Sequence, residues 1–237
     1  VEGTFELDAS IMEGKDLSAG AVAGLKHVKH PINAAYAVKT KSPHVMLSGA
    51  GAEEFAKEQG LEMVEDNMYF ATPKTMEWIE KLKQESKKNG TVGCVVLDKQ
   101  GNLTAGTSTG GMFKKRWGRI GDSPVIGAGT YADNNSCAVS CTGHGEYFIR
   151  HAVAFDVCAR YKYLKESVEK AADYIIHTEL NTNAGNGGLI AVDKLGNIAM
   201  PYNSGGMFRG FLYKEKGSPE IKKGCGIGKK IVVVGEK

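Results

Sequence analysis

The alternation of apolar and polar positions in the first ninety residues predicts short strands and helices in turn. Phe5 and Leu7 share one face of a strand predicted over Gly3–Asp8. The run of small apolar residues at Gly20–Leu25 indicates a buried strand. The other elements predicted here are a helix beginning at His30-Pro31, a strand over Val45–Leu47, a helix over Gly51–Gln59 closed by Gly60, and a helix from Thr72-Pro73 to Asn89-Gly90.

The most informative pattern runs from Asn89 to Thr109. Two apolar runs flank the sequence Asp-Lys-Gln-Gly-Asn, which is typical of a β-hairpin. If the turn is centred near Gln100, Thr91 at the start of the first strand lies opposite Thr109 at the end of the second. Two hydroxyl groups would then lie side by side, directly after Gly90. Threonine is also an ordinary strand residue, so the hairpin alone leaves a purely structural role open.

The second half of the chain continues the mixed pattern. A strand is predicted over Ala138–Cys141, followed by consecutive helices over Tyr147–Tyr161 and Lys165–Leu180. Lys230–Val234 is expected to form a strand at a sheet edge. Because two helices lie between two strand-rich parts, the sequence predicts a layered α/β fold.

A second hairpin repeats the first at an offset of 95 residues. Leu189–Ile198 has the same apolar run and Asp-Lys-x-Gly-Asn turn, and Gly-Gly-Met-Phe follows both hairpins. The repeat has Asn186 in the place of Thr91 and Ser204 in the place of Thr109. The hairpin therefore belongs to the fold, whereas the pair of threonines indicates chemistry confined to the first copy.

Composition narrows the classes of protein without selecting one. The 237 residues suffice for one domain or two small ones, and 42% of them are hydrophobic. A net charge of +3, spread along the chain, gives no indication of nucleic-acid binding. No apolar run approaches the ~20 residues that a membrane span requires, and the first residues resemble neither a signal nor a transit peptide, so we expect a cytoplasmic protein. The cysteines form no C-x-x-C pair and are interpreted as buried free thiols; they are Cys94, Cys137, Cys141, Cys158 and Cys225.

The residues around Gly90-Thr91 allow one particular kind of nucleophilic catalysis. A threonine hydroxyl is a poor nucleophile unless a base accepts its proton, and the α-amine of an N-terminal threonine can be that base. Thr91 becomes N-terminal only if the Gly90–Thr91 bond is cut, which its own hydroxyl could do by attacking the Gly90 carbonyl. Thr109 would orient or polarise Thr91.

Two further groups of residues complete a candidate site. Thr142-Gly143 lies at a strand-to-helix junction, where backbone N–H groups suit an oxyanion, although a plain glycine-rich turn explains the pattern equally well. His144 follows, and without a paired acid it is interpreted as a packing residue. Arg119 and Asp122 could bind the carboxylate and ammonium groups of a zwitterion, or could form a loop salt bridge.

Taken together, these motifs resemble the plant-type L-asparaginases, also called isoaspartyl aminopeptidases. The resemblance rests on Gly90-Thr-Val-Gly, Thr107-Ser-Thr-Gly-Gly, Gly118-Arg-Ile-Gly-Asp-Ser-Pro, Gly127-Ala-Gly-Thr-Tyr-Ala and Ser140-Cys-Thr-Gly-His-Gly-Glu, and on Glu6-Leu-Asp-Ala and Pro201-Tyr-Asn-Ser-Gly-Gly nearer the ends of the chain. It implies a single-domain N-terminal-nucleophile hydrolase with an αββα four-layer sandwich. Autocleavage would divide the chain into an α-subunit region, residues 1–90, and a β-subunit region, residues 91–237.

The resemblance also implies residue roles. Thr91 would be the nucleophile and Thr109 its hydroxyl neighbour, with Thr142 and Gly143 stabilising the oxyanion. The substrate-binding residues would be Arg119, Asp122 and Gly145. L-asparagine and β-aspartyl dipeptides would be hydrolysed through a β-aspartyl-enzyme ester. We expect no cofactor apart from a structural alkali cation, Na⁺ or K⁺, that relatives allow, and we expect a homodimer of αβ units with neither nucleic-acid nor membrane partners.

Two alternatives follow from departures from the family pattern. Family precursors have a strand, a cation-binding loop and a substrate-site asparagine before the Glu-Leu-Asp-Ala motif, and this chain begins just ahead of that motif. A truncated, non-catalytic paralogue acting as an assembly subunit is therefore the first alternative, and it would leave a sheet edge exposed. Glycosylasparaginase is the second, although that group tends to carry asparagine at the position of Gly111.

Overall fold

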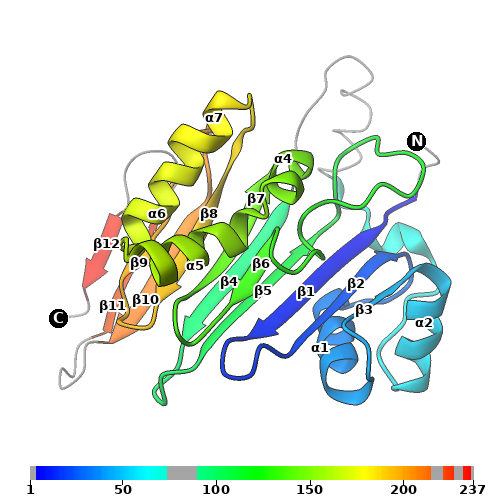
Figure 1. Ribbon diagram of the computed structural model, residues 1–237. Coiled ribbons are helices and arrows are strands. Elements are labelled where there is room, and N and C mark those ends of the chain that lie inside the picture. The colour runs from blue at the N-terminus through cyan, green and yellow to red at the C-terminus, as the bar shows by residue number, and fades with distance from the viewer. Residues whose placement is uncertain (1–3, 74–89, 215–220, 227–231, 236–237) are drawn as a thin grey trace.

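The computed structural model describes residues 4–73, 90–214, 221–226 and 232–235, in which three β-sheets are flanked by helices (Figure 1). The first sheet has the strand order β3-β2-β1-β5-β4, with all neighbours antiparallel except β2 and β3. Its strands are β1 (Leu7–Glu13), β2 (Ala19–Leu25), β3 (Met46–Ser48), β4 (Thr91–Leu97) and β5 (Leu103–Thr109). Helices α1 (Pro31–Lys41) and α2 (Gly49–Glu58) pack on β1 and β2, and a 3₁₀ turn, η1, covers Asn67–Phe70.

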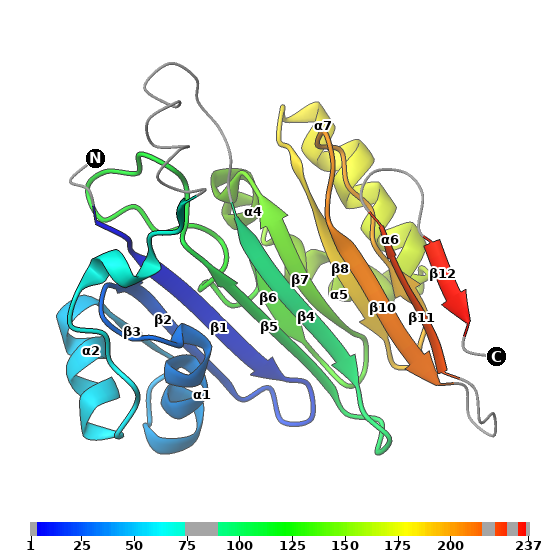
Figure 2. The ribbon, with the colours of Figure 1, turned by 180° about the vertical axis from the view of Figure 1, so that it is seen from behind.

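The second sheet has the order β6-β7-β8-β9 and is antiparallel throughout. Its strands are β6 (Thr130–Ala132), β7 (Cys137–Gly143), β8 (Gly187–Asp193) and β9 (Ile198–Ala199). The helical elements of this half are α4 (Gly145–Arg150), α5 (Val153–Leu164), α6 (Val168–Tyr174), the π-helical turn η2 (Ile175–Glu179) and α7 (Leu180–Thr182). The views in Figures 1 and 2 place α5 and α6 on the face of this sheet that is turned away from β4 and β5.

Three separate apolar cores fix this arrangement. One lies between α1, α2 and the first sheet and is built largely of small residues such as Ala34 and Ala52. Another lies between the two sheets and includes Leu103 and Ala138. The third, the one with the largest side chains, joins β7 and β8 to α5 and α6 around Phe148. The β3-β2-β1-β5-β4 and β6-β7-β8-β9 sheets therefore each bury both faces in their central part, which confirms the mixed, layered α/β fold.

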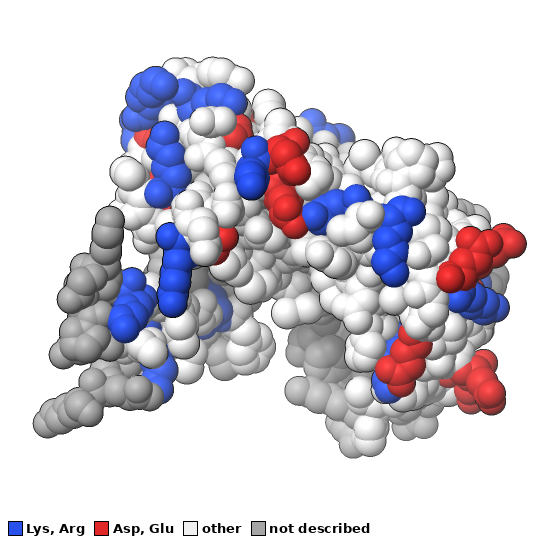
Figure 3. All heavy atoms as spheres, turned by 90° about the horizontal axis from the view of Figure 1, so that it is seen from below, with Lys and Arg blue, Asp and Glu red and all other residues white. Residues whose placement is uncertain are grey.

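A third sheet lies beside the other two in the order β10-β11-β12 (Figure 2). Its strands are β10 (Arg209–Lys214), β11 (Ile221–Gly226) and β12 (Val232–Gly235), which confirms a terminal strand at a sheet edge. In the described residues β4 is also an edge strand, and it exposes Val92, Cys94 and Val96. Figure 3 shows a hollow between the side that carries this third sheet and the side that carries α1, with acidic and basic side chains interspersed over the face.

The repeated hairpins are confirmed in detail. In β4–β5 the carboxylate of Asp98 accepts the backbone N–H of Asn102 at 2.7 Å and its side-chain amide at 2.9 Å. In β8–β9 the carboxylate of Asp193 makes the same two bonds to Asn197, at 2.9 and 2.8 Å. The Asp-x-x-x-Asn pattern thus closes two equivalent turns, one in each of the two facing sheets.

Several element boundaries differ from the predictions. The first strand covers Leu7–Glu13 instead of Gly3–Asp8, because β1 is paired on both sides and buries polar as well as apolar residues. The predicted long helix is split into α4 and α5 at Ala152, whose φ of 46° is left-handed. The second helix begins only at Val168, capped by the Ser167 hydroxyl. The predicted helix after Thr72-Pro73 lies, beyond Pro73, outside the described residues.

The interpretation of all five cysteines as buried was wrong for two of them. Cys94 and Cys225 are exposed, because each lies on a strand face that no described element covers. Cys137, Cys141 and Cys158 are buried in the core between the second sheet and its helices, and none of the five is disulfide-bonded.

Candidate active site

The predicted pair of threonines forms as the hairpin register required. Thr91 and Thr109 are directly opposed across β4 and β5. The Thr91 hydroxyl donates to Thr109 Oγ1 at 3.2 Å, and the Thr109 hydroxyl donates to the backbone carbonyl of Gly90 at 2.8 Å. The backbone N–H of Gly111 donates to Thr109 Oγ1 at 3.0 Å. Thr109 therefore contacts both the candidate nucleophile, Thr91, and the Gly90 carbonyl that Thr91 would attack.

Close packing between the sheets brings the end of β7 to the same place. A Cβ atom on Gly93 would lie only 2.1 Å from Ser140 Oγ, so β4 rests directly on β7 at this position. The two strands run in opposite directions (Figure 2). Two residues from Gly93 toward the start of β4 is Thr91, and two residues from Ser140 toward the end of β7 is Thr142. Alternating side chains share a face, so the hydroxyls of Thr91 and Thr142 lie at the same end of the interface.

A buried network of hydroxyl groups holds this end of the molecule together. Thr107 Oγ1 lies 2.7 Å from Ser140 Oγ and 2.6 Å from Thr130 Oγ1. Thr130 Oγ1 lies 2.7 Å from Ser10 Oγ, and the Ser10 hydroxyl donates to the Ser123 carbonyl at 2.5 Å. Every member is buried and hydrogen-bonded, so the network fixes the loop after Asp122 against β1 and β5.

Two of the predicted substrate-binding residues, Arg119 and Asp122, both lie against the third, Gly145. A Cβ atom on Gly145 would lie 2.8 Å from an Arg119 guanidinium nitrogen and 3.0 Å from the Asp122 carboxylate. Arg119 also makes a bidentate pair with Glu146, through Nε at 2.9 Å and Nη2 at 3.0 Å. A cavity of about 410 Å³ borders Arg119 and is lined also by Lys26 and other charged residues, and Thr91 is not in its lining.

Burial dominates the electrostatics of this group. Asp122 is 5% exposed, and one of its carboxylate oxygens has no hydrogen-bond partner among the described residues. Desolvation raises the pKa of Asp122 to about 7, against the opposing effect of the Arg119 charge. Asp8, opposite Thr109 on β1, is likewise buried, and its pKa is raised by desolvation although the Lys115 ammonium lies 3.9 Å away. Asp122 thus has an unpartnered oxygen suited to a cationic ligand group.

The Thr142-Gly143 turn is held by the second hairpin. Gly143 is paired with Gly187 on β8, and the His144 N–H donates to the Asn186 carbonyl at 3.0 Å. A Cβ atom on Gly187 would lie 2.3 Å from the Thr142 carbonyl oxygen, so the two backbones touch. The following helix α4 begins at Gly145, which places the turn at a helix N-terminus.

Comparison with known proteins agrees with this geometry. An asparaginase family model matches residues 1–221. The chain belongs to the asparaginase family. The isoaspartyl peptidase of Salmonella typhimurium is 48% identical over 226 residues, which cover 90% of this chain and 72% of that protein. The isoaspartyl peptidase of Escherichia coli is 44% identical over 237 residues, 90% of this chain and 74% of that one. The isoaspartyl peptidase/L-asparaginase of Homo sapiens is 41% identical over 213 residues, 86% and 68% of the two chains.

Membership of the asparaginase family confirms the resemblance found in the sequence. The structure brings Thr91 into contact with Thr109, and Gly145 into contact with Arg119 and Asp122, whereas Thr142 and Gly143 contact the second hairpin. Their individual roles stay predictions. Two features went unforeseen. Glu146 is the main partner of Arg119, and it also lies 3.2 Å from His144 Nε2, so the interpretation of His144 as lacking a paired acid was wrong. Glu146 lies in the first turn of α4, where an acidic residue is also expected because it stabilises the helix N-terminus. Its position in the sequence therefore gave no indication that it also binds Arg119.

Ion binding, assembly and location are separate predictions for this asparaginase-family chain. The described residues contain no cluster of three histidine, cysteine, aspartate or glutamate side chains suited to a metal ion. Binding of Na⁺ or K⁺ stays a prediction, as does the homodimer. Within the described ranges, every helix is too short or too polar to cross a membrane.

Proposed function

We propose that this chain is an autoprocessing threonine amidohydrolase that cleaves L-asparagine and β-aspartyl dipeptides. The observation that carries the proposal is the hydrogen-bond chain from Thr91 through Thr109 to the Gly90 carbonyl. The names of the relatives support both substrates, since they are isoaspartyl peptidases or isoaspartyl peptidase/L-asparaginases. The two facing sheets with helices on both sides support the N-terminal-nucleophile sandwich as the fold.

In maturation, Thr91 Oγ1 attacks the carbonyl carbon of Gly90. Its proton passes to Thr109 Oγ1, 3.2 Å away, as Thr109 gives its own proton to the Gly90 oxygen, to which it is already hydrogen-bonded at 2.8 Å. This relay prevents full negative charge from building up on that oxygen in the tetrahedral intermediate. The proton then moves from that oxygen to the Thr91 nitrogen as the C–N bond breaks and the carbonyl reforms, which leaves an ester on Thr91 Oγ1, and water hydrolyses that ester. The products are a carboxylate on Gly90 and a free α-amine on Thr91, which separate the α-subunit and β-subunit regions.

In turnover, the new α-amine accepts the proton of the Thr91 hydroxyl. An α-amine has a pKa of about 7.7–8.0 in the absence of perturbation, so a useful fraction is neutral near pH 7. The hydroxyl attacks the side-chain amide of the substrate, and Thr142 with Gly143 stabilises the oxyanion. Ammonia or an amino acid leaves, and hydrolysis of the β-aspartyl ester releases aspartate.

Arg119 and Asp122 give the site its selectivity for an α-amino acid. The guanidinium is held by Glu146 through Nε and Nη2, which fixes its plane for a substrate carboxylate. The buried Asp122 carboxylate lies against Gly145 and accepts the substrate ammonium. Because substrate brings a positive charge next to Asp122, binding favours its ionised form.

The test is the mass of the purified polypeptide together with ammonia release from asparagine. The wild-type chain should yield fragments that end at Gly90 and begin at Thr91, and Thr91→Ala should stay one chain without activity. Ser108→Ala is the matched control, because Ser108 is next to Thr109 on β5 but faces the other side of the sheet. Maturation or turnover by Thr91→Ala would refute the assignment, and an inert, uncleaved wild-type chain would identify a non-catalytic paralogue.

A substrate series distinguishes the activities within the family. Asparagine, a β-aspartyl dipeptide and a glycosylated asparagine should be compared with the same matured preparation. Cleavage of the first two is expected. Preferential cleavage of the glycosylated substrate would instead identify a glycosylasparaginase.

A further inference from the structure

Two buried cysteines lie closer together than unbonded atoms normally approach. Cys137 Sγ, at the start of β7, is 2.8 Å from Cys158 Sγ on α5. The optimal separation of two unbonded carbon atoms is already about 3.5–4.0 Å, and sulfur is the larger atom. The separation exceeds an S–S bond, which is about 2.05 Å, by roughly 0.8 Å. Both residues are buried, with 0% and 2% of their surfaces exposed, and neither takes part in the proposed catalytic site.

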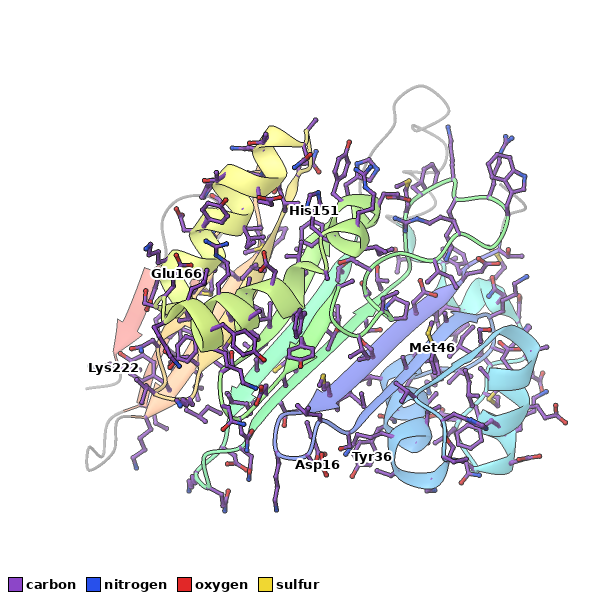
Figure 4. All side chains as sticks on the ribbon, viewed as in Figure 1. Asp16, Tyr36, Met46, His151, Glu166 and Lys222 are labelled. Atoms are coloured by element: carbon purple, nitrogen blue, oxygen red, sulfur yellow. The ribbon has the colours of Figure 1, made fainter. Side chains whose placement is uncertain are left out.

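The backbones around the pair are already locked in position. The Ser136 hydroxyl donates to the Cys158 carbonyl at 2.8 Å, and the Cys158 thiol donates to the Cys137 carbonyl at 3.2 Å. Helix α5 is also anchored beyond the pair, where Arg160 binds Glu166 at 2.9 Å; Glu166 is labelled beside this helix in Figure 4. Closure therefore requires the two sulfurs to approach by roughly 0.8 Å between backbone segments that these hydrogen bonds already hold together.

We propose that Cys137 and Cys158 are a latent disulfide, which closes when the chain folds in the presence of a small-molecule disulfide such as oxidised glutathione. One thiolate attacks the oxidant and forms a mixed disulfide, releasing one molecule of glutathione. The second thiolate then attacks the protein sulfur of that bond and releases the other. The protein loses two protons and two electrons and gains one S–S bond, while the oxidant is reduced to two thiols.

The burial of the pair determines when the bond can form. Burial raises the pKa of the Cys158 thiol well above its usual range, which suppresses the reactive thiolate once the protein is folded. Oxidant must also reach a site inside the core between β7 and α5. We therefore expect rapid closure during folding and slow closure in the folded, reduced protein.

The crosslink would stabilise the part of the chain that carries the oxyanion turn. It would close residues 137–158, a segment that includes the Thr142-Gly143 turn, α4 and the left-handed residue Ala152. Constraint of a loop of this length should raise the midpoint of thermal unfolding by roughly 5–10 °C. Cys137 lies at the far end of β7 from Gly143, so the rate per matured site should change by less than about twofold.

The experiment compares two preparations of Cys94→Ser/Cys225→Ser, a variant that lacks the exposed thiols. One is unfolded and refolded with oxidised and reduced glutathione, and the other is refolded with a phosphine reductant. Both are alkylated and digested with trypsin, which separates peptide 120–150 from peptide 151–160. The proposal predicts that the two peptides are joined only in the oxidised sample, that reductant separates them, and that the oxidised sample melts at the higher temperature.

Matched variants identify the sulfurs, because peptide 120–150 contains Cys141 as well as Cys137. Cys141→Ala should retain the crosslink, whereas Cys137→Ala and Cys158→Ala should each abolish it. Retention of the crosslink in Cys137→Ala would overturn the proposal. So would a sample that refolds to a native-like state in the presence of oxidant and in which Cys137 and Cys158 are then both found alkylated, because alkylation shows that they remained free thiols. If refolding fails, secretion of the same variants into an oxidising bacterial periplasm applies the same peptide assay to protein that folded there.

Discussion

Gly93 lies two residues after the candidate nucleophile Thr91 on β4, and its replacement offers a quantitative test of how closely β4 and β7 pack. A Cβ atom at this position would lie 2.1 Å from Ser140 Oγ and 2.9 Å from Ser140 Cβ. Neither separation is tolerable, so either Ser140 must rotate or β4 must move away from β7. Rotation of Ser140 breaks its 2.7 Å contact with the Thr107 hydroxyl.

The expected cost of Gly93→Ala follows from these contacts. Overpacking of a buried site costs about 1–3 kcal/mol. Loss of one buried hydrogen bond costs about 1 kcal/mol more. Alanine has less backbone entropy than glycine in the unfolded chain, and this difference offsets the destabilisation by about 0.5–1 kcal/mol. We therefore expect a net destabilisation of about 1–3.5 kcal/mol, which lowers the unfolding midpoint by roughly 2–14 °C in a domain of this size.

Urea unfolding in a Thr91→Ala background measures this cost without interference from chain cleavage. Gly106→Ala is the matched control. It lies opposite Cys94 on β5, and its new Cβ atom would meet only ordinary contacts at 3.6 Å or more. The control should leave the free energy of unfolding unchanged or raise it by up to about 1 kcal/mol, because only the entropy effect of alanine acts there.

A double-mutant cycle with Ser140→Gly tests the stated cause. Removal of the Ser140 side chain removes both clashing atoms, so Gly93→Ala should be less costly by at least about 1 kcal/mol in that background. Equal stability of Gly93→Ala and Gly106→Ala would refute the close approach of β4 and β7. Additive effects of Gly93→Ala and Ser140→Gly would refute Ser140 as the source of the cost.

Three further predictions concern the chemistry. Thr109→Ala removes the donor to the Gly90 carbonyl, so the rate of chain cleavage, followed on denaturing gels, should fall by about 10²–10³-fold. Arg119→Lys loses the bidentate pair with Glu146, so steady-state kinetics should show KM for asparagine raised about tenfold or more, with a smaller effect on kcat. Because the pKa of Asp122 is about 7 in the free site, its carboxyl is neutral below that pH, and KM should rise as pH falls from about 8 to about 6. Asp122→Asn should have a high KM that lacks this pH dependence, and an unchanged wild-type KM across the range would contradict the role of Asp122.

Local patterns in the sequence were sufficient to predict the hairpin and its register. A tight turn fixes which residues face each other, so the opposition of Thr91 and Thr109 required no tertiary information. Arg119 and Asp122 were proposed as a pair from their residue types and spacing, whereas Gly145 was added by family resemblance alone, because nothing in the spacing shows that a loop and a helix start will meet. Sequence order carries little information about such long-range contacts.

The misplaced first strand has a different cause, which is tertiary burial of polar positions. The Leu7–Glu13 strand was misplaced because Asp8 and Ser10 interrupt its apolar pattern, yet both are fully buried in β1 between two neighbouring strands. Ser10 has hydroxyl partners from distant elements, and these partners make the burial tolerable. Cys94 was mispredicted in the opposite sense: it was expected to be buried because its strand is apolar, and it is exposed because that strand lies at a sheet edge in the described residues.

The second hairpin explains how a duplicated element can serve a site without carrying its chemistry. At the place of Thr91 it has Asn186, whose carbonyl accepts the N–H of His144 just after the oxyanion turn. Next to it, Gly187 is paired with Gly143, and the absence of side chains lets the two backbones touch. In the proposed mechanism the first copy thus supplies the reacting groups, and the second supplies the rigid backbone that holds the Thr142-Gly143 turn in place.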